Sequence, residues 1–269
     1  MKLAEVLTGA VDYLAARGVD TPRVDAELLL ARALGLQRIE LYTQHDRPLT
    51  DPERARAREL VRRRGAREPL AYVLGDWDFR RLTLKTDARA LVPRPETEIV
   101  VERCLELLEG TAEPRIVDVG TGSGAIALAL KDERPDARVT ATDRSADALA
   151  LARENAEASG LDVELVETDL LDGLAGPFEL VVSNPPYVGA DELDALEPEL
   201  GHEPQEALVD RGQTQRLIET ARFGWLVLEV HEARAAEVAQ QLEAAGYGDV
   251  RMSQDLAGRD RIVEGRWTR

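Results

Sequence analysis

Residues 183–187, Ser-Asn-Pro-Pro-Tyr, combine an amide, two prolines and an aromatic ring directly after the largely apolar run 178–182. The run indicates a buried strand that presents the turn at its carboxyl end. The two prolines fix φ and remove two backbone donors, so the turn offers carbonyl acceptors, and Asn184 adds a side-chain oxygen. Tyr187 supplies a flat face. This combination suits a planar NH2 group, on an amide or an aromatic amine, whose nitrogen is to be alkylated.

A second segment that could do chemistry is the glycine-rich turn after the strand-like residues 115–119. Glycines let the backbone approach a ligand, and the helical pattern that opens at 126–130 points free N–H groups at it. Asp143 follows Gly120 by 23 positions and ends a second strand, 138–143. An acidic residue at about that distance is typical of a ribose-hydroxyl acceptor.

Two cofactor classes compete for this turn. The pattern Gly120-x-Gly122-x-x-Ala125 fits the dinucleotide fingerprint of an oxidoreductase. The pattern Asp-x-Gly-x-Gly-x-Gly, from Asp118 to Gly124, instead resembles the S-adenosylmethionine loop of Rossmann-like methyltransferases. S-adenosylmethionine carries no phosphates; its carboxylate suits a helix N-terminus, and its ammonium and sulfonium tolerate nearby acid. With the Asn-Pro-Pro-Tyr turn included, a methyltransferase that uses S-adenosyl-L-methionine is the favoured interpretation.

These segments and an upstream Pro-Arg-Pro-Glu-Thr-Glu at 93–98 follow an order and spacing that resembles the peptide chain release factor N(5)-glutamine methyltransferase family. The likeness covers nearly all of the chain. The segment 93–98 is its specific part, because Asn-Pro-Pro-Tyr also occurs in adenine-amine methyltransferases. The resemblance implies that the substrate is the glutamine of the Gly-Gly-Gln loop of class 1 release factors. It also implies a small helical N-terminal domain. Leu170 departs from the family pattern, since an aromatic residue often packs on the adenine there.

The expected site has three overlapping sets of residues. The catalytic set holds the substrate NH2 group through the Asn184 oxygen and the Pro185 carbonyl, and its members are Asn184, Pro185 and Tyr187. The cofactor-binding set consists of Asp118, Gly120, Thr121, Gly122, Ser123, Gly124, Asp143, Asp169, Leu170 and Asn184. The substrate-binding set consists of Asn184, Pro185, Pro186, Tyr187, Arg94 and Glu96. Alignment at about 3 to 3.5 Å carries the reaction, because the sulfonium is already a strong leaving group.

The elements that must position these residues divide the chain into three parts. Helical spacing of apolar residues predicts a small bundle over 1–75, which we expect to dock the substrate. Residues 76–110 are expected to form a hairpin linker and a first helix. From 111 to 269, strands and helices alternate, which predicts an α/β fold with a Rossmann-like methyltransferase sheet and a terminal antiparallel pair. The glycine turn, Asp143, Asp169 and Asn184 all fall at the carboxyl ends of predicted strands.

Charge and composition argue against a nucleic-acid-binding, a disulfide-linked, a membrane-spanning and a metal-binding protein. The net charge of −17 is uneven, being +2 over residues 1–75 and −19 over the remainder. So acidic a catalytic part repels a phosphate backbone and argues against direct nucleic-acid binding. The single cysteine, Cys104, excludes an internal disulfide and suits a reducing cytoplasm. No apolar run approaches the length of a membrane span, and the three histidines have no metal-ligand spacing, so we expect neither a membrane segment nor a metal.

Three alternatives stay open from the sequence. The seven arginines within 54–67 form either a solvated helix face with interspersed glutamates or a docking patch for an acidic partner or ribosomal RNA. The methyl group could instead be transferred to the exocyclic amine of adenine in DNA or RNA, because the Asn-Pro-Pro-Tyr turn at Asn184 (the Asn184 turn) fits both an amide and an aromatic NH2 group. A non-catalytic docking module that keeps its cofactor pocket for stability is a third reading, against which the intact Asn184 turn argues.

Overall fold

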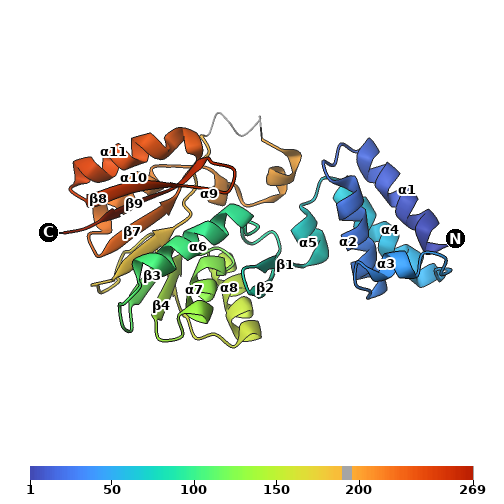
Figure 1. The fold of residues 1–269 in the computed structure, drawn as a ribbon, viewed down its shortest axis with the longest axis horizontal. Helices are drawn as coiled ribbons and strands as arrows, with labels where there is room; N and C mark the ends of the chain where they lie inside the picture. Colours follow the sequence, from blue (N-terminus) through green and yellow to red (C-terminus); the bar gives the residue numbers. More distant parts are fainter. Residues whose placement is uncertain (190–195, 269) are drawn as a thin grey trace. The chain divides into compact units, whose positions relative to one another are not determined.

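The chain forms two compact units in the computed structural model, which describes residues 1–189 and 196–268. Unit 1 comprises Met1–Asp76 and Glu197–His202, and unit 2 comprises Trp77–Leu196 and Glu203–Arg269. Figure 1 follows the chain from the helices of unit 1 into the sheet of unit 2. No helix within the described residues is long and apolar enough to cross a membrane.

Unit 1 is a bundle of short helices. Its elements are α1 (Leu3–Ala16), α2 (Pro22–Leu34), α3 (Glu40–Thr43), α4 (Asp51–Gly65), α5 (Leu70–Leu74) and the 3-10 turn η2 (Pro198–His202). Thr50 and Glu53 form a capping box that begins α4, and Gly35 ends α2 in the left-handed conformation that favours glycine. Leucines from α1, α2 and α3, among them Leu14, Leu29 and Leu41, form the core.

Six of the seven arginines within 54–67 have acidic or carbonyl partners inside unit 1. Arg62 and Arg63 pair with Glu59 and Glu68, and the buried Arg64 donates to Asp25 at 2.6 Å. The remaining partners are Asp51 for Arg54, the Ala33 carbonyl for Arg56, and Glu199 for both Arg64 and Arg67. This pairing favours the interpretation of these arginines as a compensated helix face.

Unit 2 is built on a seven-stranded sheet with the order β5-β4-β3-β6-β7-β9-β8. The strands are β3 (Arg115–Val119), β4 (Arg138–Asp143), β5 (Glu164–Glu167), β6 (Leu180–Ser183), β7 (Trp225–Glu229), β8 (Gly248–Gln254) and β9 (Asp260–Arg266). Strands β3 to β7 are parallel, whereas β9 pairs antiparallel with both β7 and β8. The α/β fold and the terminal antiparallel pair predicted from the sequence are confirmed.

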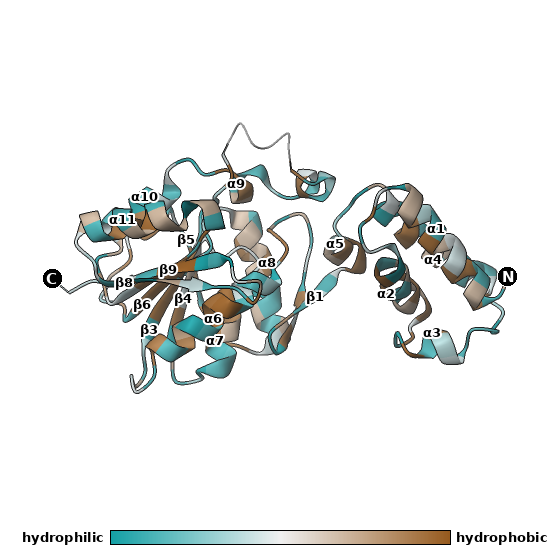
Figure 2. Ribbon diagram, turned by 45° about the horizontal axis from the view of Figure 1, so that its top comes forward, coloured by the Kyte–Doolittle hydropathy of each residue, from teal (hydrophilic) through white to brown (hydrophobic). Residues whose placement is uncertain are grey.

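Helices cover both faces of this sheet. Alternate residues along β3 and β6 face opposite sides, so Ile116 and Val182 pack with α6 (Pro95–Leu107), α7 (Ala125–Glu133) and α8 (Ala146–Ser159). Val117 and Val181 pack with α10 (Gln213–Thr220) and α11 (Ala235–Ala245). Figure 2 shows the central strands β3 and β6 in the brown of hydrophobic residues. A separate hairpin, β1 (Asp76–Phe79) and β2 (Leu82–Lys85), precedes α6.

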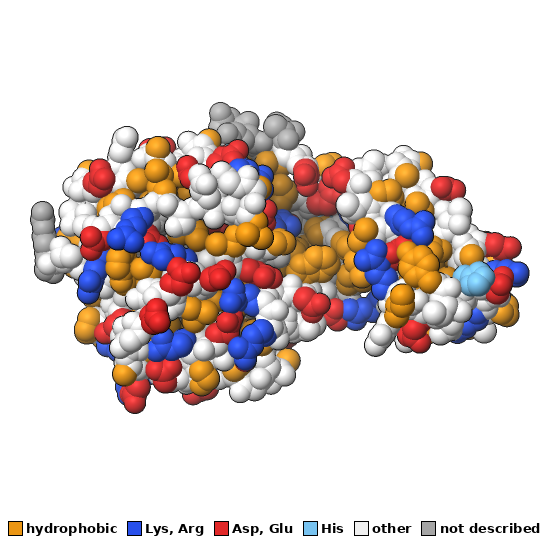
Figure 3. Space-filling view, in the orientation of Figure 1, with side chains coloured by type: hydrophobic (Ala, Val, Ile, Leu, Met, Phe, Trp, Pro, Cys, Tyr) orange, Lys and Arg blue, Asp and Glu red, His pale blue; other side chains and the backbone are white. Residues whose placement is uncertain are grey.

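The surface of unit 2 mixes both signs of charge although acids are in excess. Figure 3 shows acidic and basic side chains interleaved on the face of unit 2 that is in view. Ion pairs such as Arg80–Glu133 and Arg103–Glu264 join separate elements of the unit. The expectation against a nucleic-acid substrate rests on the net charge of −19 over residues 76–269.

Candidate functional site

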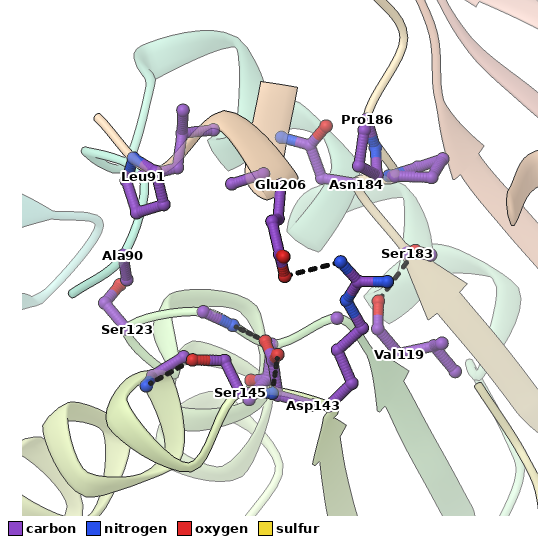
Figure 4. A pocket seen from close by; sticks show the side chains of 18 of the residues that line it. Ala90, Leu91, Val119, Ser123, Asp143, Ser145, Ser183, Asn184, Pro186 and Glu206 are labelled. Atoms are coloured by element: carbon purple, nitrogen blue, oxygen red, sulfur yellow. Dashed lines mark hydrogen bonds and ion pairs between the residues drawn. The ribbon is translucent and has the colours of Figure 1, made fainter. Parts of the chain in front are cut away.

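A cavity of about 390 Å³ opens at the carboxyl ends of the parallel strands. Its walls come from residues 88–94, the glycine turn, the ends of β4 and β6, the segment 168–170, and the short helix α9 (Gln205–Leu208). Figure 4 shows Asp143 and Ser145 on one side of it and Asn184 and Pro186 on the other. Ligands of open parallel sheets bind at this edge, so the fold itself marks the cavity as the site.

The glycine turn is held open toward the cavity by the backbone of β4. The N–H groups of Gly120 and Thr121 donate to the Thr142 carbonyl at 2.8 and 2.9 Å. Gly124 has φ 86° and begins α7 as its N-cap. A Cβ at Gly124 would lie 3.1 Å from a methyl carbon of Leu128 and 3.3 Å from the Ala152 side chain. Glycine is required at this position both for its φ and for the close packing of α7 against α8.

Asp118 supports this turn from behind and does not line the cavity. Its carboxylate is fully buried and accepts from the Thr121 hydroxyl at 2.6 Å and from Ala127 N at 3.2 Å. Burial raises the pKa of Asp118 to about 7. The strand carries this carboxylate beneath the loop, so Asp118 supports the turn, and its predicted contact with the cofactor stays a prediction. Gly124 likewise lies outside the lining.

The other eight predicted cofactor residues line the cavity. Asp143 accepts from Gly122 N at 3.0 Å and from Ser145 N at 2.9 Å, so it fixes the glycine turn and the start of α8 together. Asp169 forms an ion pair with Arg216 of α10 at 2.7 Å. Leu170 follows with φ 54° and adds apolar surface. The other members of the predicted set that line the cavity are Gly120, Thr121, Gly122, Ser123 and Asn184.

The Asn-Pro-Pro-Tyr turn begins where β6 ends. Asn184, Pro185 and Pro186 line the cavity, and Asn184 donates from Nδ2 to the Thr97 hydroxyl at 3.3 Å. Tyr187 lies outside the lining, with its ring centroid 6.1 Å from that of His231. Burial raises the pKa of Tyr187 above its ordinary value, so the phenol stays neutral. Packing of Tyr187 against a substrate amide remains a prediction.

Arg94 and Glu96 have different surroundings. Arg94 lines the cavity and pairs with the buried Glu203, whose carboxylate also accepts from Val92 N at 3.1 Å. Burial raises the pKa of Glu203 above its ordinary value. Glu96 is outside the lining and lies 3.7 Å from Arg259 in the turn between β8 and β9. Arg94 thus ties two cavity-wall segments together, whereas Glu96 is directed at the terminal strand pair.

Several residues of the site were not anticipated from the sequence. Glu206 points into the cavity, where it meets the Arg144 guanidinium (Figure 4). Thr97 lines the cavity beside Asn184, and Glu229 is buried behind it at the end of β7. Glu229 could have been found by the signal that singled out Asp143, an acidic residue ending an apolar strand. Nothing local marks Glu206, which lies on a four-residue helix.

The parallel sheet, the glycine turn and the acceptor-rich Asn184 turn in one cavity define a Rossmann-like, S-adenosylmethionine-dependent methyltransferase. The human Mettl16 catalytic domain, solved with an RNA hairpin, has this fold at a TM-score of 0.57 and 16% identity, covering 82% of this chain and 83% of that one. The Thermus thermophilus 16S rRNA N2 G1207 methyltransferase, solved with AdoMet and guanosine, matches at a TM-score of 0.54 and 17% identity over 72% and 50% of the two chains. At these identities the likeness shows the fold alone.

Sequence comparison narrows the class to one family. Residues 5–75 match the PrmC N-terminal domain, and residues 97–224 match the methyltransferase small domain. The release factor glutamine methyltransferase of Deinococcus radiodurans is 44% identical over 99% of both chains. That of Geobacter sulfurreducens is 39% identical over 98% of this chain and 96% of its own. The chain belongs to the release factor glutamine methyltransferase family, which confirms the resemblance seen in its motifs.

Proposed function

We propose that this protein transfers a methyl group from S-adenosyl-L-methionine to the side-chain amide nitrogen of the glutamine in the Gly-Gly-Gln loop of class 1 release factors. The observation that carries the proposal is the placement of Asn184 and Pro185 in the same cavity as the glycine turn and Asp143. The hydrogen-bond acceptors for an NH2 group and the residues that would bind a nucleoside thus line one cavity. The names of the curated relatives support the glutamine of a release factor as the group that receives the methyl.

The residues of the cavity fit S-adenosyl-L-methionine. Gly120 and Gly122 carry no side chain, so a ligand can approach the backbone closely at these two positions. Asp143 and Asp169 offer acceptors for the ribose hydroxyls and the adenine amine, and Leu170 and Ile126 add apolar surface for the base. When bound, the cofactor supplies an electrophilic methyl group on a sulfonium that departs as a neutral thioether.

Asn184 and Pro185 then have to orient the amide nitrogen. An amide nitrogen is a weak nucleophile because its lone pair is delocalised into the carbonyl. If the Asn184 oxygen and the Pro185 carbonyl each accept one N–H, the nitrogen is held with its lone pair directed at the methyl carbon, which converts binding into alignment. The new C–N bond leaves the nitrogen positively charged and acidic. One of its protons can leave to water, so the site does not need a strong base.

Unit 1 supplies the surface that recognises the release factor in this proposal. The match of residues 5–75 to an N-terminal domain of its own family supports a role separate from the chemistry. The lone cysteine, Cys104, is buried on α6, which is compatible with the reducing cytoplasm where release factors work.

Methylation of an adenine amine is the second candidate, because the Asn184 turn accepts either kind of NH2 group. The net charge of −19 over residues 76–269 disfavours a nucleic-acid acceptor. Purified release factor, DNA and RNA, each incubated with the enzyme and methyl-labelled donor, distinguish the candidates. We expect one added methyl on the loop glutamine by mass spectrometry, and none on a release factor whose loop glutamine is replaced by alanine. Label in nucleic acid alone would overturn the proposal.

A further inference from the structure

Asn184 has a buried partner on the neighbouring strand. Strands β6 and β7 are parallel, and their register pairs Ser183 with Leu228. Asn184 and Glu229 are the next residues along these two strands, so they lie side by side at the sheet edge. Thr97, in the first turns of α6, covers them from the adjacent layer. Three elements distant in sequence therefore bring an amide, a carboxylate and a hydroxyl together beside the cavity.

These three groups form a connected chain of polar contacts. The Asn184 Nδ2 donates to the Thr97 Oγ1 at 3.3 Å, and the Glu229 carboxylate interacts with the side chains of both Thr97 and Asn184. Thr97 is 4% exposed and Glu229 is 3% exposed. The Oε2 atom of Glu229 has no hydrogen-bond partner among the described residues. A buried carboxylate with an unused acceptor is costly, so its presence at this position calls for a role.

The chemistry of the three groups dictates which way the Asn184 amide faces. An ionised carboxylate only accepts hydrogen bonds, so it favours the NH2 end of Asn184 and repels the oxygen end. The Thr97 hydroxyl accepts from that same NH2 and can donate its own proton to Glu229. With the nitrogen held on this side, the Asn184 Oδ1 is left free for a donor from the cavity.

We propose that Glu229, together with Thr97, is a positioning residue that fixes the orientation of the Asn184 amide so that its oxygen accepts an N–H of the substrate. This inference rests on the proposed function, because it assigns the purpose of the orientation to that reaction. Glu229 does not touch the reacting atoms and acts through Asn184 alone.

The protonation state of Glu229 supplies a readout that a purely structural role lacks. Burial raises the pKa of Glu229 to about 7, Arg261 on β9 opposes that rise, and Glu96 on α6 adds to it. Tyr187 also faces this carboxyl group. A protonated Glu229 can donate to the Asn184 oxygen and stabilise the reversed amide. The rate of methyl transfer should therefore fall as the pH drops below about 7.

Glu229→Gln removes the titration with little change in shape. We expect kcat to fall by about 10- to 100-fold, as misplacement of an aligning group does, while the Kd for S-adenosyl-L-methionine changes by less than about twofold. The fall of kcat below about pH 7 should disappear in this variant. Glu264→Gln is the matched control: Glu264 is a fully buried carboxylate on β9 that pairs with Arg103, away from the cavity. That variant should keep the pH dependence of the wild type.

Thr97 gives a second pair of variants. Thr97→Val should lower kcat in the same direction as Glu229→Gln, and Thr97→Ser, which keeps the hydroxyl, should restore most of it. Wild-type kcat with an unchanged pH profile in Glu229→Gln would overturn the inference. So would an equal loss in Thr97→Val and Thr97→Ser.

The sequence allows the orientation to be read without turnover. The chain contains two asparagines, Asn155 and Asn184, so 15N-asparagine labelling gives two side-chain NH2 signals in an NMR spectrum. Asn155 donates to the Lys85 and Ser123 carbonyls and serves as an internal reference. We expect Glu229→Gln to shift the Asn184 signals and leave those of Asn155 in place. Unshifted Asn184 signals contradict the positioning role, whereas absence of methylation by the wild type contradicts the proposed function instead.

Discussion

The side-chain nitrogen of Asn184 donates to the hydroxyl of Thr97 at 3.3 Å, which links the turn after β6 to the first turns of α6. The segment 93–98 thus meets the Asn-Pro-Pro-Tyr turn inside the protein. Besides forming a wall of the cavity, this segment holds the Asn184 amide, which meets the substrate in the proposed mechanism.

Asn184→Ala should abolish turnover and leave cofactor binding in place. The variant removes the side-chain acceptor for the substrate NH2 group, while the glycine turn and Asp143 are untouched. We expect kcat to fall by at least about 100-fold, with the Kd for S-adenosyl-L-methionine within about threefold of wild type. Calorimetric titration and transfer of a labelled methyl group measure the two quantities. Turnover near the wild-type rate would refute the role of Asn184.

Asp143→Ala should weaken cofactor binding. The carboxylate accepts from two backbone N–H groups, of Gly122 and Ser145, and lines the cavity where a ribose is expected. Loss of a charged acceptor costs about 1.5 to 3 kcal/mol, so the Kd should rise by about 10- to 100-fold. Asp162→Ala removes an exposed acid next to β5 and serves as the control for the change in net charge. Equal Kd values for the two variants would contradict this role.

Gly124→Ala should destabilise unit 2 through crowding. A Cβ there meets Leu128 and Ala152 at 3.1 and 3.3 Å, whereas one at Gly110, which has a similar positive φ, meets nothing within 4 Å. Both variants place a side chain at a positive φ and so introduce similar backbone strain. The difference between their free energies of unfolding therefore isolates the packing cost, about 1 to 3 kcal/mol. Urea denaturation of the two variants measures this difference. Equal free energies of unfolding would show that α7 moves aside freely.

Asp118 should make stability depend on pH with a defined sign. Its pKa is about 7 in the folded protein, against an ordinary value of about 3.9 in the unfolded chain. Between these pH values the folded protein keeps a proton that the unfolded chain has lost. The contribution of Asp118 to the free energy of unfolding therefore falls as the pH rises from about 4 to about 7, and is constant above that.

Asp118→Asn removes this titration and isolates it from the other acids of the chain. The free energy of unfolding of the variant should increase relative to that of the wild type as the pH rises from about 4 to about 7. Denaturant unfolding of both proteins at several pH values measures the difference. A difference that stays constant from about pH 4 to about pH 7 would contradict the pKa assigned to Asp118.

The strands and the cofactor loop could be predicted because their signals are local. The apolar residues of β3 and β6 indicate strands, and the glycines after Val119 indicate a turn, each within a few positions of sequence. Asp143 and Asn184 were placed correctly at one edge because parallel strands end at the same side of a sheet. The sequence could not show that the Asp118 side chain points beneath the loop, since one step along a strand reverses the face.

The contacts between remote segments could not be predicted. Glu206 meets Arg144 and Glu203 meets Arg94 only because the chain after the Asn-Pro-Pro-Tyr turn returns to the cavity. Neither pair has a spacing that propensity or periodicity can detect. The pairing of Asn184 with Thr97 and Glu229 likewise depends on the strand order, in which β6 lies between β3 and β7.

Asp118 helps to fix the shape of the glycine turn, whereas other residues line the cavity beside it. The Asp118 carboxylate is fully buried, so it holds the turn at Thr121 from the interior of the fold without lining the cavity. A substitution of Asp118 should therefore alter the loop indirectly, through Thr121 and the first turn of α7.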